Sequence, residues 1–298
     1  MKIATGKYIG TGSARSVITA GVAPDVVFVK GAGATDAYVK MGTFASADSI
    51  ALDAGSFVTT RITALNSDGF SVGTHADVNS NGTTYYWVAF EMESSDSKNG
   101  TYTGDGTASQ VITGVGFQAD MLLVAENNAP RNWKTDDMPA ALSLRPLSNA
   151  VVPAIIALAA DGFTVGVGGT GLSINDSEVT YHYFASKNVS GKSNTVKYTG
   201  DGNDNRSITG AGFRPGVVFL QGDAPAASKM VLRFTHQSGD LSFEIDEAEQ
   251  ADKIQALETD GFQVGQGDSV NRLTGTPDYF AWLLDVRRQA QGVVNIIG

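Results

Sequence analysis

The sequence predicts an all-β protein made of three tandem, homologous β-sandwich domains of jelly-roll-like type. The main observation is a pattern, Ile-x-Ala-Leu followed by Asp-Gly-Phe, that begins at Ile62, Ile155 and Ile254. The second is a composition with 35 Gly and only 17% charged residues, which favours strands joined by tight turns. The spacing is much longer than the roughly 20 to 50 residues of a solenoid or propeller unit, so each repeat is expected to be a whole domain.

Other landmarks agree with this period. Tyr102 and Tyr198 open Tyr-Thr-Gly-Asp-Gly segments, and Tyr8 opens a weaker copy. Aromatic strands are expected to begin at Trp87, Tyr183 and Tyr279. Polar stretches after the first two of these strands are natural linkers, so the predicted domains are residues 1–93, 94–191 and 192–298.

Each repeat opens with a short strand, a Gly/Asp/Asn turn and a second short strand, best preserved in residues 197–213. An apolar, β-branched segment without alternation follows, which predicts a strand covered on both faces. These apolar segments are residues 24–30, 119–124 and 215–220. The next part of each repeat diverges most, so the frame repeats while the middle varies.

The variable middle of the third repeat contains the clearest local pattern. Residues 232–234 and 241–245 alternate on either side of a polar turn at 237–240, which predicts a hairpin with one buried face. Residues 246–257 form the only stretch that we interpret as a helix.

Each Asp-Gly-Phe is interpreted as a hairpin turn, because Gly can take the positive φ that a type I turn with a bulge requires. The Phe that follows is expected to restart the strand and to face inward. The closing strand of each repeat then combines bulky residues with a small Ala, which predicts a central strand that a neighbouring layer can approach closely. These closing strands are residues 87–90, 183–186 and 279–282.

Composition argues against several classes of function. A formal charge of −10, with no basic run longer than Arg287-Arg288, disfavours binding to nucleic acid or to an anionic membrane. The absence of Cys excludes disulfides and thiolate chemistry. The first residues lack the apolar core of a signal peptide, and no run of 18 apolar residues occurs. We therefore expect a soluble protein without an export signal.

The residues that could perform chemistry do not repeat. His75, His182 and His236 occupy different places in their repeats, so no shared metal site is expected. No Gly-x-Ser-x-Gly pattern is present. Residues 201–205 superficially resemble a calcium loop, but position six is Arg206, where such a loop has Gly, and position twelve is Gly212, where it has an acidic ligand, so we interpret them as a turn. The sequence predicts no catalytic, cofactor-binding or metal-binding residue and no enzyme.

One polar and aromatic cluster remains as a candidate contact site, namely Arg131, Asn132 and Trp133. An exposed Trp among hydrogen-bonding groups could stack on a sugar or on a partner protein. The alternative is a Trp that seals the edge of its sandwich. The β-prone residues 292–298 likewise leave two possibilities, an added strand on a neighbouring subunit or the last strand of the chain's own sheet.

The repeated residues resemble a β-sandwich domain of tailed-bacteriophage structural proteins, of the tail-fibre or head-decoration type. The resemblance lies in the Tyr-x-Gly-x-Gly turn, in the Gly-Phe-x-Pro start of the apolar strand and in residues 64–73 and 76–90. It covers all three repeats. Gly216 departs from the family pattern, which has Asp there, and the Arg-Gly or His-containing stretch of the family's variable middle is not preserved.

The resemblance implies a non-enzymatic structural component of a virion, attached to the tail or the head and assembled in the host cytoplasm. Its expected partners are other virion proteins and further copies of itself in a homo-oligomer, without a cofactor. The three copies could also mimic a threefold arrangement. The alternative function is a carbohydrate-binding or adhesin module that contacts host-surface glycans, with Trp133, or Trp87 and Trp282, as stacking surfaces.

Overall fold

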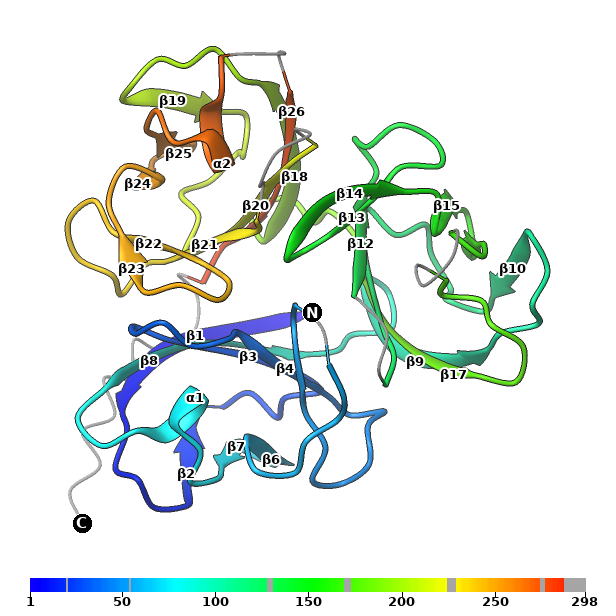
Figure 1. Cartoon of the computed structure of the whole chain (residues 1–298), viewed down its shortest axis with the longest axis horizontal. Helices are drawn as coiled ribbons and strands as arrows, with labels where there is room; N and C mark the ends of the chain where they lie inside the picture. Colours follow the sequence, from blue (N-terminus) through cyan, green and yellow to red (C-terminus); the bar gives the residue numbers. More distant parts are fainter. Residues whose placement is uncertain are drawn as a thin grey trace.

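The chain forms three β-sandwiches arranged around a common centre (Figure 1). The computed structural model describes residues 1–19, 21–53, 55–127, 131–168, 173–223, 229–273 and 277–286. In these ranges the only helices are two single turns, α1 (Ala76–Asn79) and α2 (Asp268–Asn271). The prediction of an all-β protein with three tandem sandwiches is therefore confirmed.

The first repeat sets the pattern of a large and a small antiparallel sheet. The large sheet has the order β1-β8-β3-β4-β5 and the small sheet the order β2-β7-β6. The strands are β1 (Lys2–Ile9), β2 (Arg15–Ile18), β3 (Val26–Gly31), β4 (Tyr38–Met41), β5 (Ile50–Ala51), β6 (Ile62–Asn66), β7 (Gly69–Val72) and β8 (Thr84–Glu91).

The second repeat has the same two layers. Its large sheet has the order β14-β13-β12-β11-β17-β9 and its small sheet the order β10-β16-β15. The strands are β9 (Ser97–Thr103), β10 (Gln110–Thr113), β11 (Met121–Ala125), β12 (Asn132–Thr135), β13 (Ser143–Arg145), β14 (Ser148–Val152), β15 (Ile155–Ala159), β16 (Gly162–Val165) and β17 (Thr180–Ser186).

The third repeat repeats this arrangement once more. Its large sheet has the order β18-β26-β20-β21-β22-β23 and its small sheet the order β19-β25-β24. The strands are β18 (Ser193–Thr199), β19 (Arg206–Thr209), β20 (Val217–Gly222), β21 (Val231–Phe234), β22 (Ser242–Glu244), β23 (Glu249–Gln250), β24 (Ile254–Glu258), β25 (Gly261–Val264) and β26 (Asp278–Leu284). Every sheet takes its strands from one repeat.

A pair of stacked tyrosines marks the same point inside each sandwich. Tyr8 of β1 stacks on Tyr85 of β8 with ring centroids 5.2 Å apart, and the other two repeats have the same pair. The equivalent residues that begin the aromatic part of the closing strands are therefore Tyr85, Tyr181 and Tyr279. The sequence analysis placed the start of the first two closing strands at Trp87 and Tyr183, which is two residues too late. The reason is that these strands carry aromatic residues both there and two residues earlier.

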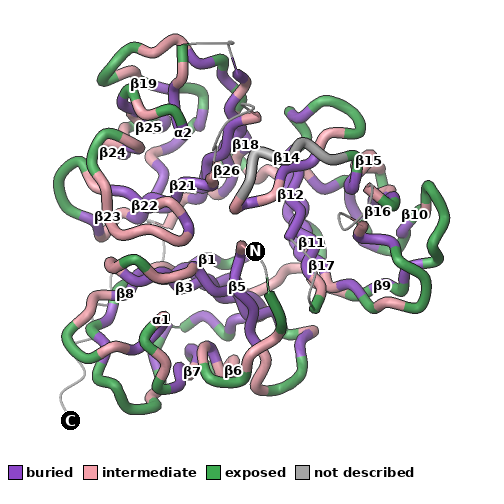
Figure 2. The backbone as a smooth tube through the Cα atoms, viewed as in Figure 1, coloured by how far each residue is buried: buried purple, intermediate pink, exposed green. Residues whose placement is uncertain are grey.

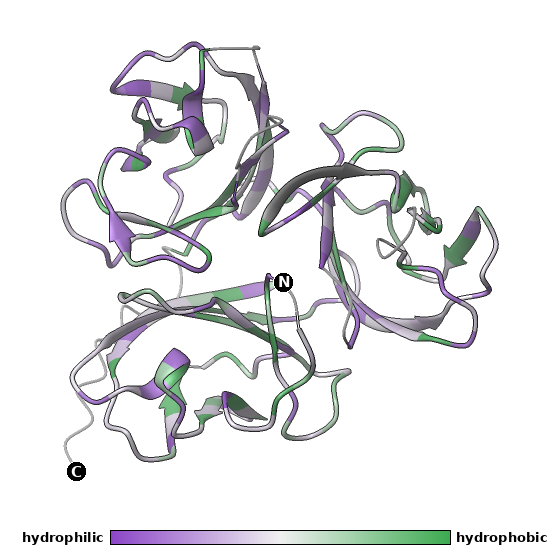
Figure 3. Cartoon of the chain, viewed as in Figure 1, coloured by the Kyte–Doolittle hydropathy of each residue, from purple (hydrophilic) through white to green (hydrophobic). Residues whose placement is uncertain are grey.

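The apolar strands β3, β11 and β20 are buried along their whole length, which confirms that both faces are covered. One face packs on the small sheet of the same repeat. The other face joins a central core to which all three repeats contribute, and Figure 2 shows the buried strands turned toward that centre. Apolar stretches of β3 and β20 border the centre in Figure 3, whereas many outer loops are hydrophilic.

Aromatic rings connect the three repeats within this core. Phe90 of the first repeat stacks on Trp282 of the third at 5.4 Å and contacts Phe184 of the second at 5.1 Å. Phe184 and Trp282 also contact each other, edge to face, at 5.7 Å. Burial of such rings is a large stabilising contribution, so each repeat depends on the other two.

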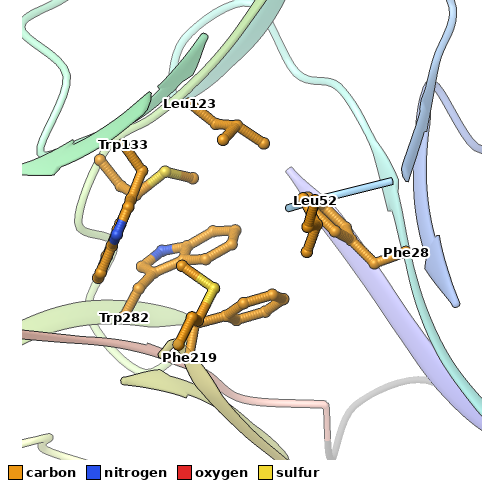
Figure 4. Close-up of a pocket in the computed structure, with 8 residues that line it drawn as sticks. Phe28, Leu52, Leu123, Trp133, Phe219 and Trp282 are labelled. Atoms are coloured by element: carbon orange, nitrogen blue, oxygen red, sulfur yellow. The ribbon is translucent and has the colours of Figure 1, made fainter. Parts of the chain in front are cut away.

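A small cavity remains where the three large sheets meet (Figure 4). Its volume is about 20 Å³, so the centre is close-packed rather than hollow. The indole rings of Trp133 and Trp282 lie on one side and Phe28 and Leu52 on the other. The lining comes from all three repeats: Phe28, Leu52, Met121, Leu123, Trp133, Phe219, Met230 and Trp282.

The predicted hairpins are confirmed. Each Asp-Gly-Phe joins two paired strands of a small sheet, and Gly69 has a φ of 145°. A Cβ at Gly69 would lie 1.9 Å from the carbonyl oxygen of Val17, so only Gly fits. The register irregularity lies earlier, between Ile62 and Ala64, and recurs in the other copies. The hairpin of β21 and β22 is also present, with Leu232 and Phe243 facing the central core.

The predicted helix over residues 246–257 is wrong. Two strands lie there instead, β23 paired with β22 and β24 paired with β25. Strand pairing with the repeated frame overrides the weak local helix preference. Residues 292–298 lie outside the described residues.

The shared core predicts that the three sandwiches unfold together. Each repeat contains one buried tryptophan, namely Trp87, Trp133 and Trp282. With fluorinated tryptophan, all three native ¹⁹F signals should disappear at the same denaturant concentration, because loss of one repeat exposes the inner faces of the other two. Separate midpoints for the three signals would contradict a common core.

Candidate functional site

A buried asparagine recurs in all three repeats and holds the opening turn. In the third repeat, Asn271 Oδ1 accepts the Asp201 N–H at 3.0 Å, and Asn271 Nδ2 donates to the Asn203 carbonyl at 2.8 Å. Asp201 also accepts the Asn203 N–H at 2.9 Å, so residues 201–205 form a self-bonded turn, as predicted. The equivalent asparagines, each fully buried, are Asn79, Asn175 and Asn271.

A buried cation also recurs, and the sequence interpretation missed it. Lys134 Nζ donates to the carbonyls of Pro139 and Leu142 at 2.7 and 2.6 Å. Lys40 does the same in its own loop, and Arg233 donates to Gly239 and Ile254. The signal was a basic residue at the third position of β4, β12 and β21, the strands that follow the apolar strands. Because each cation donates to carbonyls of the loop that follows its strand, and Arg233 also to Ile254 of β24, it holds that loop in shape.

The carboxylate of each Asp-Gly-Phe likewise accepts hydrogen bonds from the protein's own backbone. Asp260 accepts the N–H groups of Gly210 and Gly212 at 3.2 and 2.6 Å, and Asp161 accepts those of Gly114 and Gly116 at the same distances. The polar residues that recur therefore serve turns and loops by bonding the backbone.

The cluster Arg131, Asn132 and Trp133 lies inside the protein. The exposed fractions are 0%, 0% and 2%, so the expected surface for stacking on a glycan is not there. The indole Nε1 of Trp133 donates to Gln221 Oε1 of the third repeat at 2.6 Å. The guanidinium of Arg131 donates to the carbonyls of Ala51 and Gly55 in the first repeat, each at 2.9 Å. The cluster thus joins the second repeat to both neighbours.

Trp87 and Trp282 are also buried, with exposed fractions of 4% and 2%. A sugar cannot reach any of the three tryptophan rings in this structure. The alternative in which these rings form a stacking surface is therefore corrected, since Trp133 and Trp282 pack in the central core and Trp87 packs inside the first sandwich.

Three of the polar contacts between repeats close a circle. Lys30 of the first repeat donates to Glu247 O of the third at 2.7 Å, and Gln221 of the third donates to Arg145 O of the second at 2.7 Å. Arg131 of the second repeat completes the circle by donating to the first. The donors Lys30 and Gln221 lie in β3 and β20, and the donor Arg131 lies between β11 and β12. Among the acceptors, Ala51 and Arg145 end β5 and β13, and Glu247 follows β22.

Backbone bonds repeat at two of these interfaces. The N–H of Ala37 donates to Ile245 O at 2.7 Å, and the N–H of Met230 donates to Pro146 O at 2.7 Å. Ala37 and Met230 occupy equivalent positions, two residues before Val39 and Leu232, which pair with the equivalent Phe28 and Phe219. The interfaces are therefore pseudosymmetric and head to tail.

Burial shifts the pKa of the cations at these contacts. It lowers the pKa of Lys30 to about 8 and that of Arg131 to about 10. Lys30 offsets part of this cost with bonds to the carbonyls of Gly31 and Gly33 at 2.9 and 3.0 Å, and it lies 4.8 Å from the centre of the Phe243 ring.

Gly216 replaces the Asp of the family pattern for a structural reason. Asp25 and Asp120 accept the N–H groups of Met92 and Asn188, which anchors the two linkers between repeats. In the third repeat, a Cβ at Gly216 would lie 1.9 Å from the side chain of Val286. Packing of Val286 therefore takes the place of the carboxylate.

The three histidines lie in different repeats and have different neighbours. His75 caps α1 and accepts the Asp77 N–H, and His182 contacts Thr43 at 3.0 Å between the rings of Phe44 and Phe57. His236 follows β21. The described residues contain no group of three or more His, Asp or Glu side chains placed to hold a metal ion. They also contain no helix with the length and hydropathy needed to cross a membrane.

Replacing Lys134 by Arg, the residue that the third repeat has at this position, should flatten the pH dependence of stability. Burial lowers the pKa of Lys134 from 10.5 to about 8, so the unfolded chain binds more protons between these pH values. The Lys134 contribution therefore makes the free energy of unfolding rise with pH in this window. Denaturation at pH 8 and pH 10 should show a smaller rise for K134R than for the wild type. Equal rises would show that the pKa of Lys134 is not lowered in the folded protein.

The bond between Trp133 and Gln221 can be tested with a matched pair of substitutions. Trp133→Phe and Trp282→Phe remove the same volume from the same core, but only the first removes an indole donor with a bonded acceptor, because no partner for Trp282 Nε1 is found in the described residues. W133F should lower the free energy of unfolding by about 1–3 kcal/mol more than W282F. Urea denaturation measures the difference, and equal losses would show that the bond contributes nothing.

Comparisons with known proteins find one similar family and no role. Residues 3–100 match the family model described as a domain of unknown function, DUF7483. The matched span is close to one repeat period, because Ile3 and Ser97 occupy equivalent places at the start of β1 and β9. No curated protein matches the chain. The first sandwich is thus similar to the DUF7483 domain.

Proposed function

We propose that this protein is a non-enzymatic structural component of a tailed-phage virion, attached to the tail or the head. The observation that carries the proposal is the common core, which joins three sandwiches into one pseudo-threefold body. Such a body offers three similar outer surfaces at fixed relative positions. This is a useful property for a component that is mounted on a larger particle.

The use of the polar residues supports the same role. The asparagines, the buried cations and the hairpin carboxylates that recur are bonded to the protein's own backbone, so they stabilise shape. The copy-specific residues Lys30, Arg131 and Gln221 close the ring. The link to a virion rests on the resemblance of the repeated sequence to tailed-phage structural domains.

The proposed partners are other virion proteins and further copies of this chain. Because the inner faces of the three large sheets are buried in the common core, such partners would contact the outer loops and the small sheets. Assembly would take place in the host cytoplasm and needs no cofactor.

The test is the composition of purified particles. Virions separated on a density gradient should contain this protein at a fixed copy number relative to the main structural proteins, measured by quantitative mass spectrometry. Its presence in the infected lysate but not in the particle fractions would overturn the proposal.

A further inference from the structure

An open cleft of about 540 Å³ lies at the junction of the first and second repeats. One wall belongs to the first repeat and includes Asp25, just before β3, and Met92, just after β8. The other wall belongs to the second repeat and includes Lys98 and Asn99 of β9 and the turn from Gly114 to Gly116. This volume is within the usual range of small-molecule sites, roughly 300–1,000 Å³.

The lining offers hydrogen-bond donors and acceptors side by side. Asp25 is a carboxylate acceptor whose Oδ2 already accepts the Met92 N–H at 2.7 Å. Lys98 donates one N–H to the Gly114 carbonyl and has two more N–H groups to offer. The amide of Asn99 makes only a long bond, 3.3 Å, to the Asp25 carbonyl. Gly114 leaves open space where a Cβ would stand.

The second junction, between the second and third repeats, has the same backbone but different side chains. Asp120 anchors Asn188 there as Asp25 anchors Met92. Asn188 Nδ2 donates to Thr195 Oγ1 at 2.8 Å, and Thr195 Oγ1 donates to Asp136 at 2.7 Å. Polar side chains thus bond one another across the second junction.

The first junction lacks this chain of hydrogen bonds. Met92, Asn99 and Gly42 stand at the positions of Asn188, Thr195 and Asp136. Gly42 is the clearest case, because its N–H donates to Asp25 O as the Asp136 N–H donates to Asp120 O. The first junction therefore lacks the side-chain bridge of the second, and its Met92 and Asn99 line the cleft instead.

We propose that the cleft between the first two repeats binds a neutral carbohydrate of one or two sugar units. A sugar hydroxyl both donates and accepts, so neighbouring hydroxyls can donate to Asp25 and accept from Lys98 and Asn99 at once. The methylene and thioether groups of Met92 supply an apolar contact for the C–H face of the ring. The formal charge of −10 and the carboxylate of Asp25 disfavour an anionic ligand.

This site is separate from the buried tryptophans, and it does not depend on the proposed function. If the protein were absent from purified virions, the result of the sugar titration would still stand. If the protein did not bind sugar, the result of the particle analysis would still stand.

The test uses the full ¹⁵N-labelled chain titrated with glucose, galactose and N-acetylglucosamine, and separately with inorganic phosphate. At least one sugar should shift the amide signals of Lys98, Asn99 and Gly114 to Gly116. Lys98→Ala should weaken that binding at least about tenfold, because it removes charged hydrogen bonds to the sugar. Asn194→Ala, the matched change at the second junction, should leave binding unchanged.

A closing variant provides the second arm. Gly42→Asp, Met92→Asn and Asn99→Thr together give the first junction the side chains of the second, and a Cβ at Gly42 meets no atom closer than 3.4 Å. This variant should fold and lose sugar binding. No shift of the cleft amides with any of the three sugars, shifts with phosphate alone, or equal binding by K98A and the wild type would each overturn the proposal.

Discussion

The structure depends on the need to bury both faces of each large sheet. The strands β3, β11 and β20 are apolar on both sides, and a small three-stranded sheet can cover only one side. The second side must meet another apolar surface, because exposing it would cost the free energy of hydrating several large side chains. Three repeats solve the problem mutually, since each large sheet covers part of the other two around Phe90, Phe184 and Trp282.

Closing the ring required departures from strict repetition. Lys30 and Gln221 occupy equivalent positions but Arg131 does not, and each of these side chains satisfies a particular carbonyl of the neighbouring repeat. The junctions differ in the same way, because Asp25 and Asp120 anchor a linker, whereas Gly216 makes room for Val286. The frame therefore sets the sandwich, and the copy-specific residues set its place in the ring.

Sequence reasoning was effective where the cause is local. The hairpins at Asp-Gly-Phe follow from a backbone that only Gly can adopt, and the buried strands follow from an uninterrupted apolar run. It failed over residues 246–257, where pairing with β22 and β25 overrides a weak preference. It left Trp133 undecided between an exposed stacking surface and a residue that seals its sandwich, because polar neighbours suggested a surface. Those polar groups are in fact bonded to other repeats, as with Arg131 and the carbonyl of Ala51.

By itself the sequence determined the number of repeats, their all-β class and the turns that shape them, because these depend on periodicity and on backbone conformations that single residues impose. Only the tertiary structure decided that the repeats share one core, that the lone cations Lys40, Lys134 and Arg233 hold loops, and that the first junction is open. These features depend on contacts between residues far apart in the chain, and no local pattern specifies which distant carbonyl a buried donor will meet.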